Sequence, residues 1–249
     1  MSTAADAVPT SEKPRTEVER VVDTFIAPSK TFTDIRRNAS WWVPFLMVSL
    51  AWVALVWVVD KQIGMETVTE NQLRLSPKQE ARMENMPPDQ RASAMALVVK
   101  VNRIIFYAFP VIFLIFDLIF AGVMLGTMNF GFGATLKFGQ CMAVATYSGL
   151  PTALKTILAI LLVAIGSNEG FIFQNPLAGS NLGMLVDPQS HFLFAMAVSF
   201  DAFMIWAVIL AGIGYSCLTR VKRTTCMIVV FTWWLIMVLV LSALGALSA

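Results

Sequence analysis

Long apolar segments alternate with short polar ones along most of the chain. An α-helix needs about 20 apolar residues to cross the roughly 30 Å hydrocarbon core of a bilayer. Five segments reach this length, and none shows the polar face of a helix in a soluble protein. They cover residues 40–59, 104–128, 138–165, 191–218 and 225–247. The pattern predicts an all-α polytopic membrane protein, a bundle of five transmembrane helices.

The residues before the first span divide into two parts. Residues 1–16 are polar and predict a disordered cytoplasmic tail. Residues 17–39 carry apolar side chains at helical spacing, interrupted by Pro28, and predict an amphipathic juxtamembrane segment on the cytoplasmic membrane surface. Basic and tryptophan side chains are expected at such an interface. The predicted membrane-surface residues are Phe25, Phe32, Arg36, Arg37, Trp41 and Trp42.

The loop at residues 60–103 has helix signals of its own. Ser76 followed by Pro77 predicts an N-cap and a proline at the first helical position, with Gln79 completing a capping box. Pro87 and Pro88 end that helix, after which a second one runs into the next span. We expect an extracytoplasmic helical hairpin here, within a membrane domain that covers residues 40–249.

Charge is scarce and unevenly placed. Charged residues make up 14% of the chain, against about 25% in soluble domains. The net charge is +2, and because acids match the bases in each segment, nucleic acid is not an expected partner. The single histidine excludes a His-rich metal site, and no catalytic motif occurs. We expect no catalytic residues, no metal and no cofactor.

The distribution of basic residues predicts the orientation. Arg36 and Arg37 precede the first span, and three bases lie in the loop at 219–224. Residues 166–190, in contrast, contain no Lys or Arg. Because cytoplasmic loops carry an excess of Lys and Arg, the N-terminus is expected in the cytoplasm and the C-terminus outside.

Three charged residues fall inside the predicted spans, namely Asp117, Lys155 and Asp201. A charge at mid-bilayer costs about 2.5–3.5 kcal/mol on insertion scales. Their similar predicted depth allows a cluster with Lys155 between the two carboxylates. Two interpretations stay open: a buried ion pair that fixes helix register, or a proton relay, cation relay or polar substrate site.

Two of the spans contain helix-breaking residues. Pro110 lies in the second span, and the third span contains Tyr147, Ser148, Gly149 and Pro151 in one short stretch. Proline and glycine kink or break helices. A break in the membrane frees backbone carbonyls, which can line a cavity. Tyr147 and Ser148 are candidates to satisfy them.

The second span also carries a small-residue pair. Gly122 and Gly126 are separated by three residues. This spacing permits close contact between transmembrane helices. The pair is therefore a candidate helix-contact site.

Several stretches in a fixed order resemble the Yip family, polytopic membrane proteins named for their interaction with Ypt/Rab GTPases. The resemblance covers about residues 20–245. The stretches are FIAPSKTF at 25–32, WWVP at 41–44, GATLK at 133–137, YSGLP at 147–151, FDAFMIW at 200–206 and GIG at 212–214.

The resemblance implies five spans with a cytoplasmic N-terminus and no catalytic residues. Eukaryotic members act in vesicle trafficking through cytoplasmic N-terminal regions and partner membrane proteins. This chain has only about 38 residues before its first span, so Rab-type GTPase binding is not carried over. The chain looks similar to the bacterial members of the family, which implies a location in the bacterial cytoplasmic (inner) membrane.

Two functional hypotheses follow. The first is a non-enzymatic integral membrane protein that organises membrane or protein assemblies, with the lipid bilayer, membrane-protein partners or a second copy as its contacts. The alternative is a small transporter or channel that uses Asp117, Lys155 and Asp201.

Overall fold

The protein is all-helical in the residues that the structure describes. The computed structural model describes residues 13–166 and 169–248, and within them the one β-type pairing is an isolated bridge between Asn181 and Asp201. The predicted tail at 1–16 lies mostly outside the described residues. Among the described helices, four are long and apolar enough to cross a membrane. The all-α membrane prediction is confirmed.

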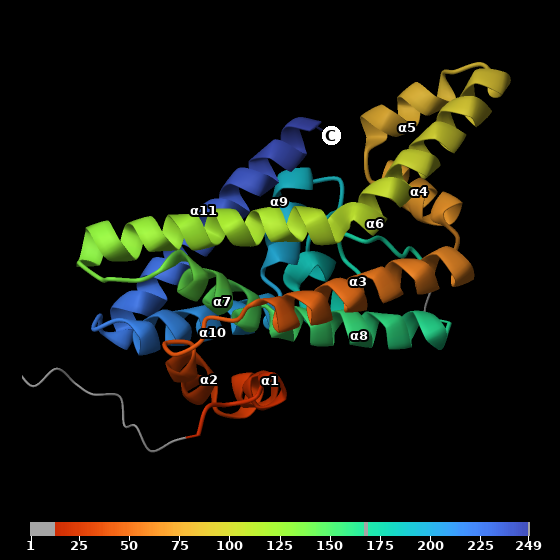
Figure 1. Ribbon diagram of the computed structural model, residues 1–249. Helices are drawn as coiled ribbons and strands as arrows, with labels where there is room; N and C mark the ends of the chain where they lie inside the picture. The colour runs from red at the N-terminus through yellow and green to blue at the C-terminus, as the bar shows by residue number, and fades with distance from the viewer. Residues whose placement is uncertain (1–12, 167–168, 249) are drawn as a thin grey trace, which may run out of the picture.

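Four predicted spans correspond to these long helices, one of them broken in two. The helices are α3 (Trp42–Gln62), α6 (Pro88–Gly126), which a π-helical turn η1 (Thr127–Gly131) extends, α7 (Phe138–Ser148) with α8 (Leu150–Ala164), and α11 (Arg223–Ser248). In Figure 1, α3 and α8 run side by side and α6 crosses one face of the bundle.

The predicted span at 191–218 is not one continuous helix. It forms α9 (His191–Ser199) and α10 (Ala202–Leu218), and neither reaches the length of a single crossing. Phe200 and Asp201 lie between them, with Asp201 in extended backbone conformation. There is no proline or glycine at this point, and the break arises because Asp201 caps α10 instead of continuing α9.

The loop at 60–103 contains more helix than predicted. The expected helix is α5 (Pro77–Glu84), and α6 begins at Pro88 as the proline pair indicated. Ser76 occupies the N-cap position of α5, but its side chain makes no capping hydrogen bond. A further helix, α4 (Met65–Arg74), buries Met65 and Val68. The predicted hairpin is therefore a three-helix unit at one end of the molecule (Figure 1).

Part of the connection between α8 and α9 also packs into the protein. Phe171, Ile172 and Phe173 are buried, and the ring of Phe173 packs at a tilt against that of Phe106 in α6, with ring centroids 4.1 Å apart. Two short 3-10 turns, η2 (Ala178–Ser180) and η3 (Leu182–Leu185), follow. This segment was expected only as an outer loop. Its packing brings polar loop residues to the junction between α9 and α10.

The N-terminal segment forms two short helices, α1 (Glu17–Ile26) and α2 (Pro28–Asp34), separated where Pro28 predicted. Its predicted position on the membrane surface is wrong for Phe32. The Phe32 side chain is fully buried in the main core, and α2 packs against α10. Phe25 is half-buried, with its ring edge-on to Trp206 at 5.6 Å.

The remaining surface residues behave differently from Phe32. Arg36, Arg37 and Trp42 are exposed, whereas Trp41 is half-buried beside Phe45. The physical reason for the difference is that α2 packs against α10 with Phe32 on the side that enters the apolar core. Burial against protein removes Phe32 from the membrane surface while its basic neighbours stay outside.

This close packing is possible because α10 has a glycine where α2 approaches. A Cβ placed on Gly214 would lie 2.8 Å from Cγ1 of Val144 and 3.0 Å from Cδ1 of Phe32. Real Cβ atoms do not approach other atoms this closely. Only glycine at this position lets α2, α7 and α10 pack as they do.

We expect Gly214→Ala to loosen α1 and α2 from the bundle. Overpacking costs typically 1–3 kcal/mol, although alanine also gains about 1 kcal/mol of helix propensity. Gly245→Ala in α11 is the matched control, because an added Cβ there meets nothing within 4 Å. Thermal unfolding in detergent and tryptic cleavage near Lys30 should distinguish the two variants. Equal stability and equal cleavage would contradict the packing role of Gly214.

Candidate functional site

Asp201 is the centre of a polar junction inside the bundle. Its Oδ1 accepts hydrogen bonds from the backbone N–H groups of Phe203 (2.9 Å) and Met204 (3.2 Å), which caps α10. Its Oδ2 accepts a hydrogen bond from the Ser180 hydroxyl and pairs with Nζ of Lys155 at 3.0 Å. Four donors therefore surround a carboxylate whose side chain is 4% exposed.

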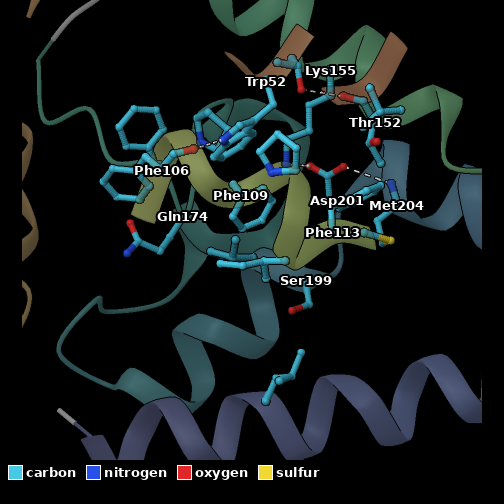
Figure 2. Close-up of a pocket in the computed structure, with 18 of the residues that line it drawn as sticks. Trp52, Phe106, Phe109, Phe113, Thr152, Lys155, Gln174, Ser199, Asp201 and Met204 are labelled. Atoms are coloured by element: carbon cyan, nitrogen blue, oxygen red, sulfur yellow. Dashed lines mark hydrogen bonds and ion pairs between the residues drawn. The ribbon is translucent and has the colours of Figure 1, made fainter. Parts of the chain in front are cut away.

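Lys155 reaches this carboxylate from the middle of α8. The ion pair links α8 to the N-cap of α10 (Figure 2). The hydrogen bond from Ser180 connects both to the loop before α9. Of the three predicted intramembrane charges, the structure brings Lys155 and Asp201 together. The N-cap role of Asp201 has a sequence signal, because aspartate before an apolar helix is a preferred cap. Ser180 gave no comparable signal.

Asp117 does not join this junction. It lies on α6, and its Oδ2 is buried with no hydrogen-bond partner in the described part of the chain. Its electrostatic neighbour is Tyr215 of α10, which in turn interacts with Cys141 of α7. The predicted arrangement with Lys155 between two carboxylates is therefore not what the structure shows, because Tyr215 lies near the opposite end of α10 from Asp201, about 20 Å along the helix axis.

The predicted break in the third span lies at Gly149. This residue ends α7 and precedes α8, with Pro151 in the first turn of α8. The Ser148 hydroxyl donates to the carbonyl of Ala145 (2.9 Å), and the Thr152 hydroxyl donates to that of Gly149 (2.7 Å). Both carbonyls also accept backbone N–H groups, of Gly149 and Thr152 respectively, so these hydroxyls add second hydrogen bonds and do not satisfy freed carbonyls.

Two other predicted break residues behave differently. Helix α6 continues through Pro110 without interruption. Tyr147 satisfies no carbonyl of its own helix. Its hydroxyl instead donates to Oε2 of Glu17 in α1, at 2.6 Å. Tyr147, which was predicted to act at the helix break, therefore connects α7 of the bundle to α1 of the N-terminal segment.

That contact is part of a buried charged network. Arg20 is 2% exposed and pairs with Asp34 of α2, with NH2 and Oδ2 2.8 Å apart. Burial by itself lowers the pKa of Arg20, but its hydrogen bonds to Asp34 and Tyr147 outweigh this and raise the pKa above its usual value. Arg20 belongs to the segment predicted to lie on the membrane surface, but its side chain is buried inside the protein. The network holds α1, α2 and α7 together.

A cavity of about 510 Å³ adjoins the Lys155–Asp201 pair (Figure 2). Side chains from α3, α6, α8, α9, α10, α11 and the loop before α9 line it, and most of them are apolar or aromatic. Trp52 is fixed at its edge, because its indole N–H donates to the carbonyl of Phe106 at 2.9 Å. In the described residues no group of three or more His, Cys, Asp or Glu side chains is placed to hold a metal ion. The arrangement supports binding more readily than covalent chemistry.

Substitutions at Asp201 should separate its two roles. Asp201→Asn keeps a good N-cap but removes the charge, whereas Asp201→Ala removes both. Breaking a buried ion pair costs about 3–5 kcal/mol, and losing a cap costs about 1 kcal/mol more. We expect the thermal unfolding temperature in detergent to fall in the order native, Asn, Ala. Asp187→Asn, in the exposed loop, is the control. An Asp201→Ala variant as stable as the native protein would contradict the structural role of the pair.

Comparison with known proteins identifies the family. The Yip1 domain model matches residues 22–244, which is nearly the whole described chain. No curated protein and no solved structure gives a significant match. The match agrees with the apolar helices in placing the protein in a membrane, and the family is not known for enzymatic activity. The chain belongs to the Yip family of integral membrane proteins.

Proposed function

We propose that the protein is a non-catalytic integral membrane protein that organises assemblies in the membrane, by contacting a second copy or a partner membrane protein. The observation that supports this is the outer face of α6. Along this helix almost no residue of the apolar region is buried within the bundle. Large apolar side chains stand outward along it, including Val111, Ile115 and Ile119.

The glycine pair on this helix favours contact with another helix. An added Cβ on Gly122 or Gly126 would meet nothing within 4 Å, so neither glycine serves packing inside the chain. Lipid gains nothing from a glycine, but a neighbouring transmembrane helix can approach closely there. A pair of glycines four residues apart on an unpacked helix therefore supports a helix–helix contact between molecules.

The topology that goes with this function has five crossings, α9 and α10 together forming the fourth. The N-terminus lies in the cytoplasm and the C-terminus outside, in a bacterial inner membrane. In support, exposed Arg36 and Arg37 and the bases at 219–224 lie at the ends of α3 and α11 that would face the cytoplasm.

The transport alternative receives less support from the geometry. A relay needs its titratable groups within reach of one another, whereas Asp117 lies away from the Lys155–Asp201 pair. The carboxylate of Asp201 already has four donors. An ion pair held in this way fits a structural role better than the passage of ions.

The glycine pair provides a direct test of assembly. We expect Gly122→Leu and Gly126→Leu to weaken self-association or partner binding at least about tenfold, because a bulky side chain prevents close helix approach. The fold should be preserved, since the space around both positions is open and leucine favours helix. Light scattering and crosslinking in mild detergent, with quantified co-purifying proteins, measure the effect.

Gly245→Leu on α11 serves as the control, because its surroundings are equally open. It should leave the assembly unchanged. A native protein that is monomeric and has no stoichiometric partner would refute the proposed function. So would an assembly that is insensitive to both α6 substitutions.

A further inference from the structure

The cavity beside Lys155 has the properties of a ligand site. Its volume of about 510 Å³ falls within the 300–1,000 Å³ of typical small-molecule sites, which are mostly apolar with a few placed polar groups. Trp52, Phe106, Phe109 and Phe113 supply aromatic surface (Figure 2). The polar lining comes from Lys155, Asp201 and several hydroxyl groups.

The two charged groups in this lining, Asp201 and Lys155, differ in how many of their hydrogen-bonding positions are used. Asp201 has donors from Ser180 and from two backbone N–H groups besides Lys155, and it caps the positive end of the α10 dipole. The Lys155 ammonium has three N–H donors, and Asp201 is its one acceptor among the described residues. Lys155 therefore keeps unused donors, and its charge is only partly used in neutralising Asp201.

A second polar group in the cavity has no hydrogen-bond partner among the described residues. The Ser49 hydroxyl of α3 is buried, lines the cavity and makes no hydrogen bond within the described structure. A buried polar atom left unsatisfied costs about 1–3 kcal/mol. The Ser49 hydroxyl and the free donors of Lys155 both line the cavity, and they are the donors available to an oxygen acceptor that enters it.

The cavity is also reachable from the apolar phase. Ile105 of α6 and Met237 and Leu241 of α11 line it, and each of these apolar side chains is at least 37% exposed. An apolar chain could therefore enter between α6 and α11 without crossing a polar surface. This access favours a ligand dissolved in the bilayer over one dissolved in water.

We infer that this cavity binds a single-chain amphiphile with an anionic oxygen head group, its head at Lys155 and Ser49 and its chain along the aromatic wall. This goes beyond the proposed role in assembly and does not depend on it. The shared chemistry is a carboxylate or phosphate on one acyl chain, which a free fatty acid or a lysophospholipid would supply.

The test uses the full chain in detergent with cis-parinaric acid, a fluorescent fatty acid, and energy transfer from tryptophan as the readout. Trp52 and Trp234 line the cavity and are suitable donors. We expect saturable binding at one site per chain. Displacement by oleate or by oleoyl lysophosphatidic acid distinguishes the two sources of the head group, and displacement by either one supports the inference.

Two variants test the two halves of the site. Lys155→Gln should weaken binding at least about tenfold, in line with the loss of a charge-assisted hydrogen bond. Ser199→Phe places a ring in the cavity and leaves the ion pair intact, so it should abolish binding even if Lys155→Gln does not fold. Lys61→Gln, an exposed lysine at the end of α3, should bind as the native protein does.

Three results would overturn the inference. One is the absence of saturable binding to the native protein. Another is binding that Ser199→Phe leaves unchanged, which would indicate partition into the detergent micelle. The third is displacement by oleyl alcohol as effective as that by oleate, because the head group would then need no negative charge.

Discussion

The buried contact between Lys155 and Asp201 is the interaction on which the arrangement of the bundle depends. A carboxylate in the membrane interior is costly, and here it is stabilised by an ammonium group, a hydroxyl and two backbone amides. To receive these donors Asp201 must leave helical geometry. The same residue therefore breaks one apolar segment into α9 and α10 and joins α10 to α8.

This break determines what surrounds it. Ser180 and Asn181 reach Asp201 from the preceding loop, through a hydrogen bond and an isolated β-bridge. The loop is thereby drawn into the bundle, where Phe171 and Phe173 pack beside α3 and α8. The cavity lies next to this junction, lined by both halves of the broken segment and by α6 and α11. The residue that caps α10 therefore also contributes to the wall of the cavity.

Features that depend only on residues close together in the sequence were predictable. The boundaries of α3 and α11, the proline-started α2 and α5, and the break at Gly149 follow from apolar length and helix-ending residues. Helix α4 was missed because its sequence contains few apolar residues, and it forms by packing Met65 and Val68 on the spans. The second break was missed because Asp201 was considered as a charge and not as a cap.

By itself the sequence determined that this is a helical membrane protein, since the length of an apolar segment and the cost of charge in lipid are local properties. The tertiary structure alone decided which charges meet. Arg20 pairs with Asp34 inside the protein, Lys155 meets Asp201, and Asp117 is left beside Tyr215. These outcomes depend on the rotation of each helix about its axis and on close approaches such as that at Gly214, which arise from packing between segments far apart in the chain.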